Sequence, residues 1–360
     1  MKIASIIAEY MPFHNGHARH ISLTRERGAD IVIAIMDGHI SQRGDISPLS
    51  RASRALAALR CGADIVVELP TLFACRTADV FARAGVETAL MLGSDTLSFG
   101  SESGDIEELT RPENDPESVR QALERGESYP RALGASAEPN DILAREYLCA
   151  LEGTGIEPLV IQRNSSYHSG DMGQFASASA IRAAVKRGEN AERAVPEEAR
   201  FQLGEMEFSG AYDLLRLAAL RSLSAEGIKE LPDVNEGIEN LMSEAAKQPT
   251  LIEALGYAKC KRYTYSRLNR LCAHALIGLT GELAKRHPHI EYLRLTGFRD
   301  NGALEAVTKR MKMPFSRAGE LKNSEIFALE NRATDLWALT RSREDERTGS
   351  QEYLSKVIRL

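Results

Sequence analysis

Two histidines near the N-terminus stand on one short turn, His14-Asn15-Gly16-His17. The turn follows an apolar run at residues 3–8 and precedes helical spacing at residues 16–27. Nucleotide phosphates bind where a buried strand ends and a helix begins, because the free amides of the helix N-terminus face them. Two imidazoles there can donate to phosphoryl oxygens while charge builds on an attacked α-phosphate and its leaving pyrophosphate. Gly16 lets the backbone approach the ligand without a Cβ. The turn therefore predicts a site at which ATP is attacked at its α-phosphorus.

A motif this short also occurs by chance, in which case both histidines are incidental loop residues. Its place directly after the first predicted strand favours the nucleotide site over that alternative.

Three later segments also follow predicted strands or open a predicted helix. Arg43 in residues 41–45 can reach a phosphate or a carboxylate, and Gly100 in residues 98–105 would let an adenine or ribose lie against the backbone. Ser177 and Ser179 open a helix whose amides suit a terminal phosphate, and Arg182 adds positive charge. Each has a plain alternative: a solvated arginine, an ordinary turn glycine and a simple N-cap.

The pattern of apolar segments indicates the fold that positions these groups. Strands are predicted at residues 3–8, 31–36, 65–69, 96–99 and 158–162, with helices between them at 16–27, 50–60, 78–92 and 141–151, and a further helix at 177–187. Strands that are apolar throughout are buried on both faces, which favours a parallel sheet with helices outside it. We therefore expect an α/β fold whose residues 1–190 form a doubly wound, Rossmann-like nucleotidyltransferase domain that binds ATP.

Helical spacing dominates beyond residue 190, in segments 195–223, 234–246, 251–258 and 266–279. We expect residues 191–360 to form a mainly helical domain. The highly charged tail after Ser342 is predicted to be a loosely held terminal helix.

The predicted helical half contains a basic segment interleaved with tyrosines. Between residues 251 and 275 the only acid is Glu253, whereas the segment contains Lys259, Lys261, Arg262, Arg267 and Arg270, together with Tyr257, Tyr263 and Tyr265. Basic side chains neutralise backbone phosphates and tyrosines stack on exposed bases, which is typical of binding to single-stranded RNA. The alternative is a solvated helix face with tyrosines in the core.

Composition limits the class of protein. The 360-residue chain has a formal net charge of −6, which argues against a general nucleic-acid coat but not against a local basic patch. Its five cysteines are scattered without a C-x-x-C pair, so we expect free thiols and no metal site. The N-terminal apolar run is too short for a signal peptide, and no run reaches the length of a membrane span. We expect a soluble, cytoplasmic protein without membrane association, and the sequence indicates no protein partner.

Taken together, the motifs resemble those of the nucleotidyltransferase superfamily with His-x-Gly-His, which includes pantetheine-phosphate and nicotinamide-mononucleotide adenylyltransferases. The finer resemblance is to the tRNA(Met) cytidine acetate ligase family. It rests on six segments in the family's order: IAEYMPFHNGHARH (7–20), SQRGD (41–45), GADIVVELP (62–70), GSDTLSFGSESGD (93–105), PNDILAREYL (139–148) and KCKRYTYSRLNRL (259–271).

The resemblance implies an ATP-dependent enzyme that forms acetyl-adenylate and pyrophosphate from ATP and acetate, with Mg²⁺ on the phosphates. It further implies that the acetyl group passes to N4 of the wobble cytidine of elongator tRNA(Met), forming N4-acetylcytidine without acetyl-CoA.

The family's functional residues carry over to particular positions of this chain. The groups implied to balance the negative charge are His14, His17, Arg163 and Arg182. The implied ATP contacts are Ile7, Ala8, Glu9, Tyr10, Met11, Pro12, Phe13, His14, Asn15, Gly16, His17, Ala18, Arg19, His20, Gly100, Asn140 and Arg163. The match of Arg163 uses the following pair Tyr167-His168. The resemblance also favours the RNA-binding interpretation of the basic segment, so we expect the helical domain to bind the tRNA through Lys259, Lys261, Arg262, Arg267 and Arg270.

The chain departs from the family's usual pattern at three places. Met11 and Asp141 stand where the family usually has Asn, and Ser50-Arg51 stands where it usually has Asp-Lys. We expect these changes to affect affinity and substrate detail rather than the class of reaction. Glu9 is a candidate general base for the cytidine amine only by its proximity in sequence.

Two other functions are compatible with parts of the pattern. A small-molecule adenylyltransferase of the pantetheine-phosphate or nicotinamide-mononucleotide type would explain the N-terminal motifs but leave the basic tyrosine segment without a role. A non-catalytic RNA-binding protein with a decayed nucleotide fold would explain the basic segment, but the presence of both histidines and Gly16 argues against decay.

Overall fold

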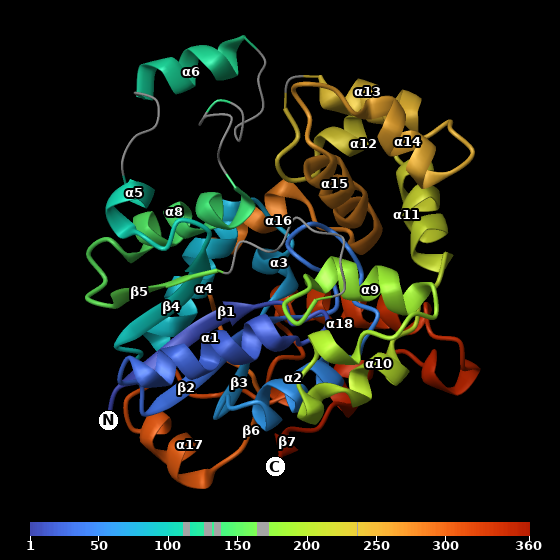
Figure 1. Cartoon of the computed structure of the whole chain (residues 1–360). Coiled ribbons are helices and arrows are strands. Elements are labelled where there is room, and N and C mark those ends of the chain that lie inside the picture. The colour runs from blue at the N-terminus through green and yellow to red at the C-terminus, as the bar shows by residue number, and fades with distance from the viewer. Residues whose placement is uncertain (111–115, 126–131, 133–137, 164–172, 236) are drawn as a thin grey trace.

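The computed structural model describes residues 1–110, 116–125, 132, 138–163, 173–235 and 237–360 (Figure 1). Its centre is a seven-stranded sheet in the order β5-β4-β1-β2-β3-β6-β7. The strands are β1 (Ile3–Ala8), β2 (Ile31–Asp37), β3 (Ile65–Leu69), β4 (Thr96–Ser101), β5 (Glu157–Gln162), β6 (Leu295–Phe298) and β7 (Ile358–Arg359). The first five confirm the strands predicted from sequence, with ends that differ by at most two residues.

The first five strands are parallel and are wound in two directions from β1, which pairs with β2 on one side and β4 on the other. The first half of the chain supplies the helices α1 (Asn15–Glu26), α2 (Arg51–Arg60), α3 (Thr71–Ala74), α4 (Ala78–Met91), α5 (Ile106–Thr110), α6 (Pro116–Glu124) and α8 (Pro139–Leu151). The carboxyl ends of β1 and β4 flank the point at which the winding reverses, and doubly wound sheets bind their ligands there. The predicted doubly wound α/β fold is therefore confirmed.

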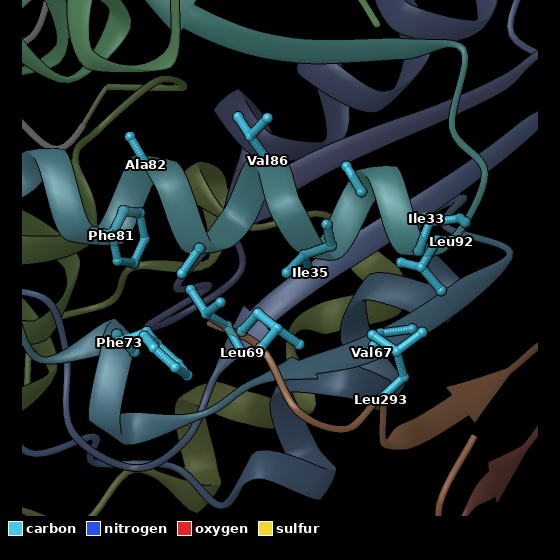
Figure 2. Close-up of a cluster of buried hydrophobic side chains, with 14 of the residues drawn as sticks. Ile33, Ile35, Val67, Leu69, Phe73, Phe81, Ala82, Val86, Leu92 and Leu293 are labelled. Carbon is cyan, nitrogen blue, oxygen red and sulfur yellow. The ribbon is translucent and has the colours of Figure 1, made fainter. Parts of the chain in front are cut away.

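Alternate residues of the strands face opposite layers of helices, because side chains alternate along a strand. Ile33 and Ile35 of β2 lie in one apolar core together with Phe81 and Val86 of α4 (Figure 2). Ala34 and Met36 face the other core, which α1 and α2 cover. Burial on both faces explains why these strands are apolar throughout.

The second half of the chain supplies most of the remaining helices. They are α9 (Ala178–Lys186), α10 (Phe201–Glu205), α11 (Ala211–Ser222), α12 (Ala225–Lys229), α13 (Ile238–Ala245), α14 (Leu251–Ala258), α15 (Tyr265–Ile277), α16 (Gly281–Arg286), α17 (Asn301–Thr308), α18 (Glu325–Ala338) and α19 (Gln351–Leu354). Helices α11 to α15 enclose a third apolar core, with Leu220, Met242 and Leu255 at its centre. None of the helices in the described parts of the chain is long and apolar enough to cross a membrane. All five cysteines are free, as predicted.

Residues beyond 290 return to the sheet, which the sequence analysis did not predict. Strand β6 pairs antiparallel with β3, and β7 pairs parallel with β6. Leu293 packs in the same core as Val67 of β3 (Figure 2). Residues 191–360, predicted to form a mainly helical domain, therefore also contribute two strands to the sheet. The two strands have only four and two residues, too few to give a strand pattern in the sequence.

The prediction of a loosely held terminal helix is wrong. Residues 351–354 form α19, and Glu352 is fully buried beside α18. Glu352 is an internal ion-pair partner, whereas the charged residues Arg343 and Asp345 of the same tail are exposed.

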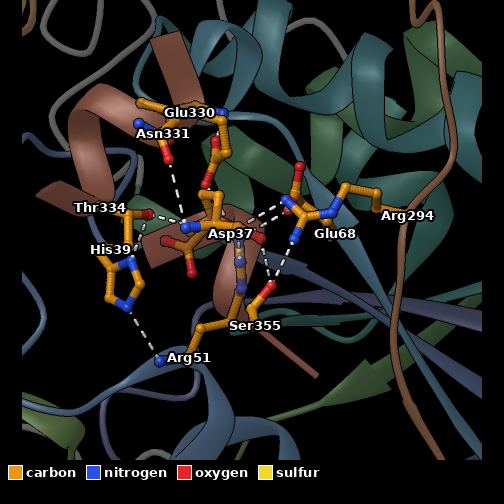
Figure 3. A network of polar contacts seen from close by, with 12 residues as sticks. Asp37, His39, Arg51, Glu68, Arg294, Glu330, Asn331, Thr334 and Ser355 are labelled. Atoms are coloured by element: carbon orange, nitrogen blue, oxygen red, sulfur yellow. Dashed lines mark hydrogen bonds and ion pairs between the residues drawn. The ribbon is translucent and has the colours of Figure 1, made fainter. Parts of the chain in front are cut away.

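A buried network of charged side chains binds the tail to the sheet (Figure 3). Arg51 of α2 donates through Nη1 to Glu68 Oε2 at 2.7 Å and through Nη2 to Glu352. Arg294 Nη1 lies 2.8 Å from Glu68 Oε2 and 2.7 Å from Glu352 Oε2. Glu330 of α18 also pairs with Arg51, and burial together with the neighbouring Glu68 carboxylate raises the pKa of Glu330 to about 7. If Glu330 is protonated, the charges of the network balance, because the carboxylates of Glu68 and Glu352 then face the guanidinium groups of Arg51 and Arg294.

The network predicts a large loss of stability when Arg51 is removed. We expect Arg51→Met to lower the free energy of unfolding by about 3–5 kcal/mol, because buried carboxylates lose their partner. Urea unfolding followed by circular dichroism measures this change. Arg343→Met removes an ion pair that is about two-thirds exposed on both sides and should leave the midpoint unchanged. Equal midpoints for wild type and Arg51→Met would show that the network does not stabilise the fold.

Candidate active site

A pocket of about 1790 Å³ opens at the carboxyl edge of the parallel strands. One side of it comes from the segment after β1, the loop at residues 41–45 after β2, and the ends of β4 and β5. The start of α9 and the start of α15 line it as well. The pocket therefore brings the predicted ATP motif and the predicted RNA-binding segment, about 250 residues apart in sequence, to one cavity.

The two histidines of the turn are held by the backbone at the start of α1. His14 caps the helix, and its Nδ1 accepts a hydrogen bond from Gly16 N–H at 3.0 Å. The backbone N–H of His14 donates to Nδ1 of His17 at 3.2 Å, and the two rings stack with centroids 3.6 Å apart. A neutral imidazole that accepts at Nδ1 carries its proton on Nε2. Both histidines line the pocket, so each can offer an Nε2–H donor to a ligand.

The surroundings keep these imidazoles neutral. Burial and the nearby Arg163 guanidinium lower the pKa of His14 to about 3. Burial and the neighbouring His14 hold the pKa of His17 well below its usual value. His20 contacts Ser98 Oγ of β4 through Nε2 at 2.9 Å, and burial lowers its pKa to about 4. The turn therefore supplies fixed dipolar donors, and positive charge at the site has to come from arginines.

Residues 7–20 divide into two groups. Those that line the pocket are Ile7, Ala8, Glu9, Tyr10, Met11, His14, His17 and His20. Pro12, Phe13, Asn15, Gly16, Ala18 and Arg19 support the turn from behind or continue the helix. Asn15, for example, donates through Nδ2 to Gln174 O and Arg193 O, both at 2.8 Å, which ties the turn to the residues around α9.

Gly100 and Arg163 form one unit at the ends of β4 and β5. A Cβ on Gly100 would lie 3.2 Å from Cγ and 3.3 Å from Cδ of Arg163. The missing Cβ was expected to make room for a ligand, but in this structure it makes room for the aliphatic stem of Arg163. Both residues line the pocket, so the arginine lies where its charge reaches the histidine turn.

Asn140 and Asp141 fix the loop that follows β4. Asp141 Oδ1 accepts from Glu102 N–H at 2.8 Å and from Ser103 N–H at 3.3 Å. Asn140 Nδ2 donates to Glu102 Oε1. An aspartate accepts these two backbone donors as well as an asparagine would, so this departure from the family pattern keeps the contact. The pair Tyr167-His168 lies outside the described residues.

Arg182 reaches the turn from α9. Its Nη1 donates to Met11 O at 2.7 Å, and Ser177 caps α9 by accepting from Ala180 N–H at 3.2 Å. The carbonyl of Met11 makes this contact, and the residue is 5% exposed and lines the pocket, so the departure at Met11 places an apolar residue at the pocket wall. At the departure Ser50-Arg51, Ser50 caps α2 and Arg51 lies in the buried ion network, and neither residue lines the pocket.

The loop at residues 41–45 joins the two sides of the pocket. Glu9 Oε1 accepts from Gln42 N–H at 3.0 Å, which fixes the loop to the end of β1. On its other side Asn269 of α15 donates to Arg43 O at 2.9 Å, and Tyr212 of α11 donates to Gly44 O at 3.0 Å. Gly44 has φ +81°, and a Cβ there would meet the α15 backbone at 2.8 Å, so only glycine fits this contact. Arg43 was a candidate from the sequence, but no local sequence pattern identifies Asn269 and Tyr212 as partners of this loop.

The basic segment is split between the outer surface and the pocket. Lys259 and Lys261 are exposed, whereas Arg262, Arg267 and Arg270 line the pocket. Arg270 is only 8% exposed, and Arg267 Nη2 donates to Asp233 O at 3.1 Å. The prediction of one RNA-binding surface therefore has to be divided into an outer lysine pair and an inner set of arginines.

The tyrosines of this segment are divided in a similar way. Tyr263 is 5% exposed and packs in the core of the helical cluster. Tyr265 is 49% exposed and lines the pocket, and Tyr257 is 54% exposed on α14. Stacking on a base is therefore open to Tyr257 and Tyr265, while Tyr263 has a structural role.

Comparisons with known proteins agree with this geometry. The family model described as HIGH Nucleotidyl Transferase matches residues 1–352. A tRNA(Met) cytidine acetate ligase of a Geobacillus species is 32% identical, with 94% of each chain covered. The ligase of the same name from Syntrophotalea carbinolica is 35% identical, covering 87% of this chain and 84% of its own.

Solved structures agree over the whole chain. The crystal structure of Thermotoga maritima TmcAL bound with alpha-thio ATP has a TM-score of 0.88 at 26% identity, with 100% of both chains covered. The apo form of the same protein has a TM-score of 0.90, also with full coverage. The fold and the histidine turn thus define an ATP-dependent enzyme of the nucleotidyl transferase class. Within that class the chain belongs to the tRNA(Met) cytidine acetate ligase family.

The geometry of the turn predicts the effect of removing one donor. We expect His17→Ala to reduce acetate-dependent pyrophosphate release on the order of a hundredfold, because a positioned Nε2–H donor is lost. The assay uses ATP and acetate without tRNA. His289→Ala removes an imidazole that is 69% exposed outside the pocket and should leave the rate unchanged. Near-normal release by His17→Ala would exclude the histidine turn from the reaction.

Proposed function

We propose that this enzyme activates acetate with ATP and transfers the acetyl group to N4 of the wobble cytidine of elongator tRNA(Met). The observation that carries the proposal is the shared pocket, in which the histidine turn lies on one side and the first turn of α15 on the other. The name of the relatives and the alpha-thio ATP bound to TmcAL support the same reaction.

In the first step an acetate oxygen attacks the α-phosphorus and pyrophosphate leaves, so no protein nucleophile is needed. His14 and His17 would donate to the phosphoryl oxygens, while Arg163 and Arg182 would balance the added charge. Mg²⁺ would come with the phosphates of ATP.

In the second step the cytidine amine attacks the acetyl carbonyl and AMP leaves. A base inside a folded tRNA loop has to leave its stack before its amine can reach a buried adenylate. Arg262 and Arg270 could neutralise the adjacent phosphates, and the half-exposed ring of Tyr265 offers a stacking surface beside them.

A small-molecule adenylyltransferase is the alternative that shares the first half of the site. It would leave the arginines and Tyr265 on the α15 side of the pocket without a substrate. Pyrophosphate release that depends on acetate supports the ligase, whereas release that depends on phosphopantetheine or nicotinamide mononucleotide supports the alternative. Mass spectrometry of tRNA(Met) after incubation with ATP and isotopically labelled acetate then tests the second step.

The exposed lysine pair allows a test of tRNA binding that spares the ATP site. We expect Lys259→Glu with Lys261→Glu to weaken tRNA(Met) binding at least about tenfold and to lower the salt dependence, because two phosphate contacts become repulsive. Acetyl-adenylate formation without tRNA should stay close to wild type.

The matched control is Lys309→Glu with Lys312→Glu, which makes the same charge change just after α17, at the opposite end of the molecule from α14 (Figure 1). Filter binding at several salt concentrations compares the two double variants. Equal affinities of the two would mean that Lys259 and Lys261 are simply solvated.

A further inference from the structure

The acyl-transfer step of the proposed function leaves one proton unassigned. When the N4–carbon bond forms and the carbon–oxygen bond to the phosphate of AMP breaks, AMP takes the electron pair of that bond. The N4 amine must lose a proton as it becomes an amide. A positioned base within reach of the pocket would accelerate this step on the order of a hundredfold or more.

We infer that Glu9 is the general base that takes the proton from the cytidine N4 amine during acetyl transfer. The inference rests on the proposed function and adds a catalytic residue to it. Two observations support it: the position of Glu9 in the pocket, and the hydrogen bond that engages its Oε1 but not its Oε2.

Glu9 lies at the junction of the two sides of the pocket. It follows β1 directly, and five residues further along the same segment His14 begins the phosphate-binding turn. Its Oε1 accepts from Gln42 N–H at 3.0 Å, and the next residue of that loop, Arg43, is bonded through its carbonyl to Asn269 of α15. An adenylate on the histidine turn and a base held from α15 would therefore meet beside this carboxylate.

One oxygen of Glu9 is available for a proton. Among the described residues no donor bonds to Oε2, and the residue lines the pocket. The backbone of Glu9 is fixed as well, because Arg54 Nη1 donates to its carbonyl oxygen at 2.6 Å. Oε1 and the main chain are thus held while Oε2 faces the cavity.

The charges around Glu9 suit a base that works near neutral pH. Burial raises the pKa of Glu9, although Gln42 N–H and the guanidinium groups of Arg43 and Arg182 oppose the change. Asp45 on the same loop raises it further, and Asp37 at the end of β2 and Tyr147 of α8 also lie within its electrostatic reach. A carboxylate with a raised pKa is a stronger proton acceptor than one in water.

The other carboxylates of the pocket are less suited to this role. Asp233 is partly buried, but the hydrogen bonds from Arg76 lower its pKa. Asp45 Oδ1 accepts from Asn269 at 2.8 Å, and Asp79 is exposed at the start of α4. Burial also raises the pKa of Glu102, and Asn140 bonds its Oε1, but Glu102 lies on the loop after β4 and, within the described residues, has no bond to the loop at residues 41–45 that α15 contacts. Glu138 and Glu146 belong to the α8 region.

The test separates the two half-reactions in the full-length protein. Glu9→Gln keeps an amide oxygen that can accept from Gln42 N–H, but it cannot take a proton. We expect single-turnover transfer from supplied acetyl-adenylate to tRNA(Met) to fall at least about a hundredfold. Acetate-dependent pyrophosphate release, in which Glu9 is only one of several ATP contacts, should fall at least about tenfold less than transfer does. Asp79→Asn, which removes another pocket carboxylate, should transfer at the wild-type rate. Filter binding should give the same tRNA affinity for all three proteins.

The pH profile distinguishes a base from a structural residue. In the wild type the transfer rate should rise with pH through the raised pKa of Glu9, because the ionised form is the acceptor, and then level off. In Glu9→Gln this acid limb should disappear. Wild-type transfer by Glu9→Gln would overturn the inference, and so would a parallel loss of both half-reactions with the acid limb retained. A wild type that forms no acetyl-adenylate from acetate would instead overturn the proposed function itself.

Discussion

The contact between the loop at residues 41–45 and helix α15 is the constraint on which the pocket depends. The backbone of Gly44 packs directly against the backbone of α15. Asn269 of α15 donates a hydrogen bond to the carbonyl of Arg43 in the loop. Because the loop is also bonded to Glu9, the helical cluster is held at a fixed place relative to the end of β1. The contact of His274 of α15 with Cys75 O at 2.6 Å holds the arginines of α15 near the ATP motif as well.

The histidine turn illustrates how backbone contacts prepare a site before a ligand arrives. Each imidazole accepts a main-chain N–H at Nδ1, so its tautomer and ring position are decided by the start of α1. Preorganised donors of this kind lose little free energy to reorganisation when charge develops on a phosphate. The low pKa of His14 shows that the site separates two tasks: imidazoles donate and arginines supply the positive charge.

The C-terminal residues complete the sheet, because β7 is its last strand and Glu352 is buried next to it in sequence. Glu352 can be buried because it forms ion pairs with Arg51 and Arg294. A carboxylate buried without such partners would strongly destabilise the fold. The same network includes Glu68 in the middle of β3, which explains a charged residue in a strand that is otherwise apolar and buried.

The sequence by itself determined the parallel strands, the position of the histidine turn after β1 and the class of reaction. These are local features, since periodicity, composition and a strand-to-helix turn are written in consecutive residues. Only the tertiary structure decided that β6 and β7 join the sheet, that Arg163 passes over Gly100, and that the basic segment splits into exposed lysines and pocket arginines. Each of these depends on contacts between residues far apart in the chain. Whether a charge such as Arg51 or Glu352 is solvated or buried in a pair is decided by its partners, which no local pattern names.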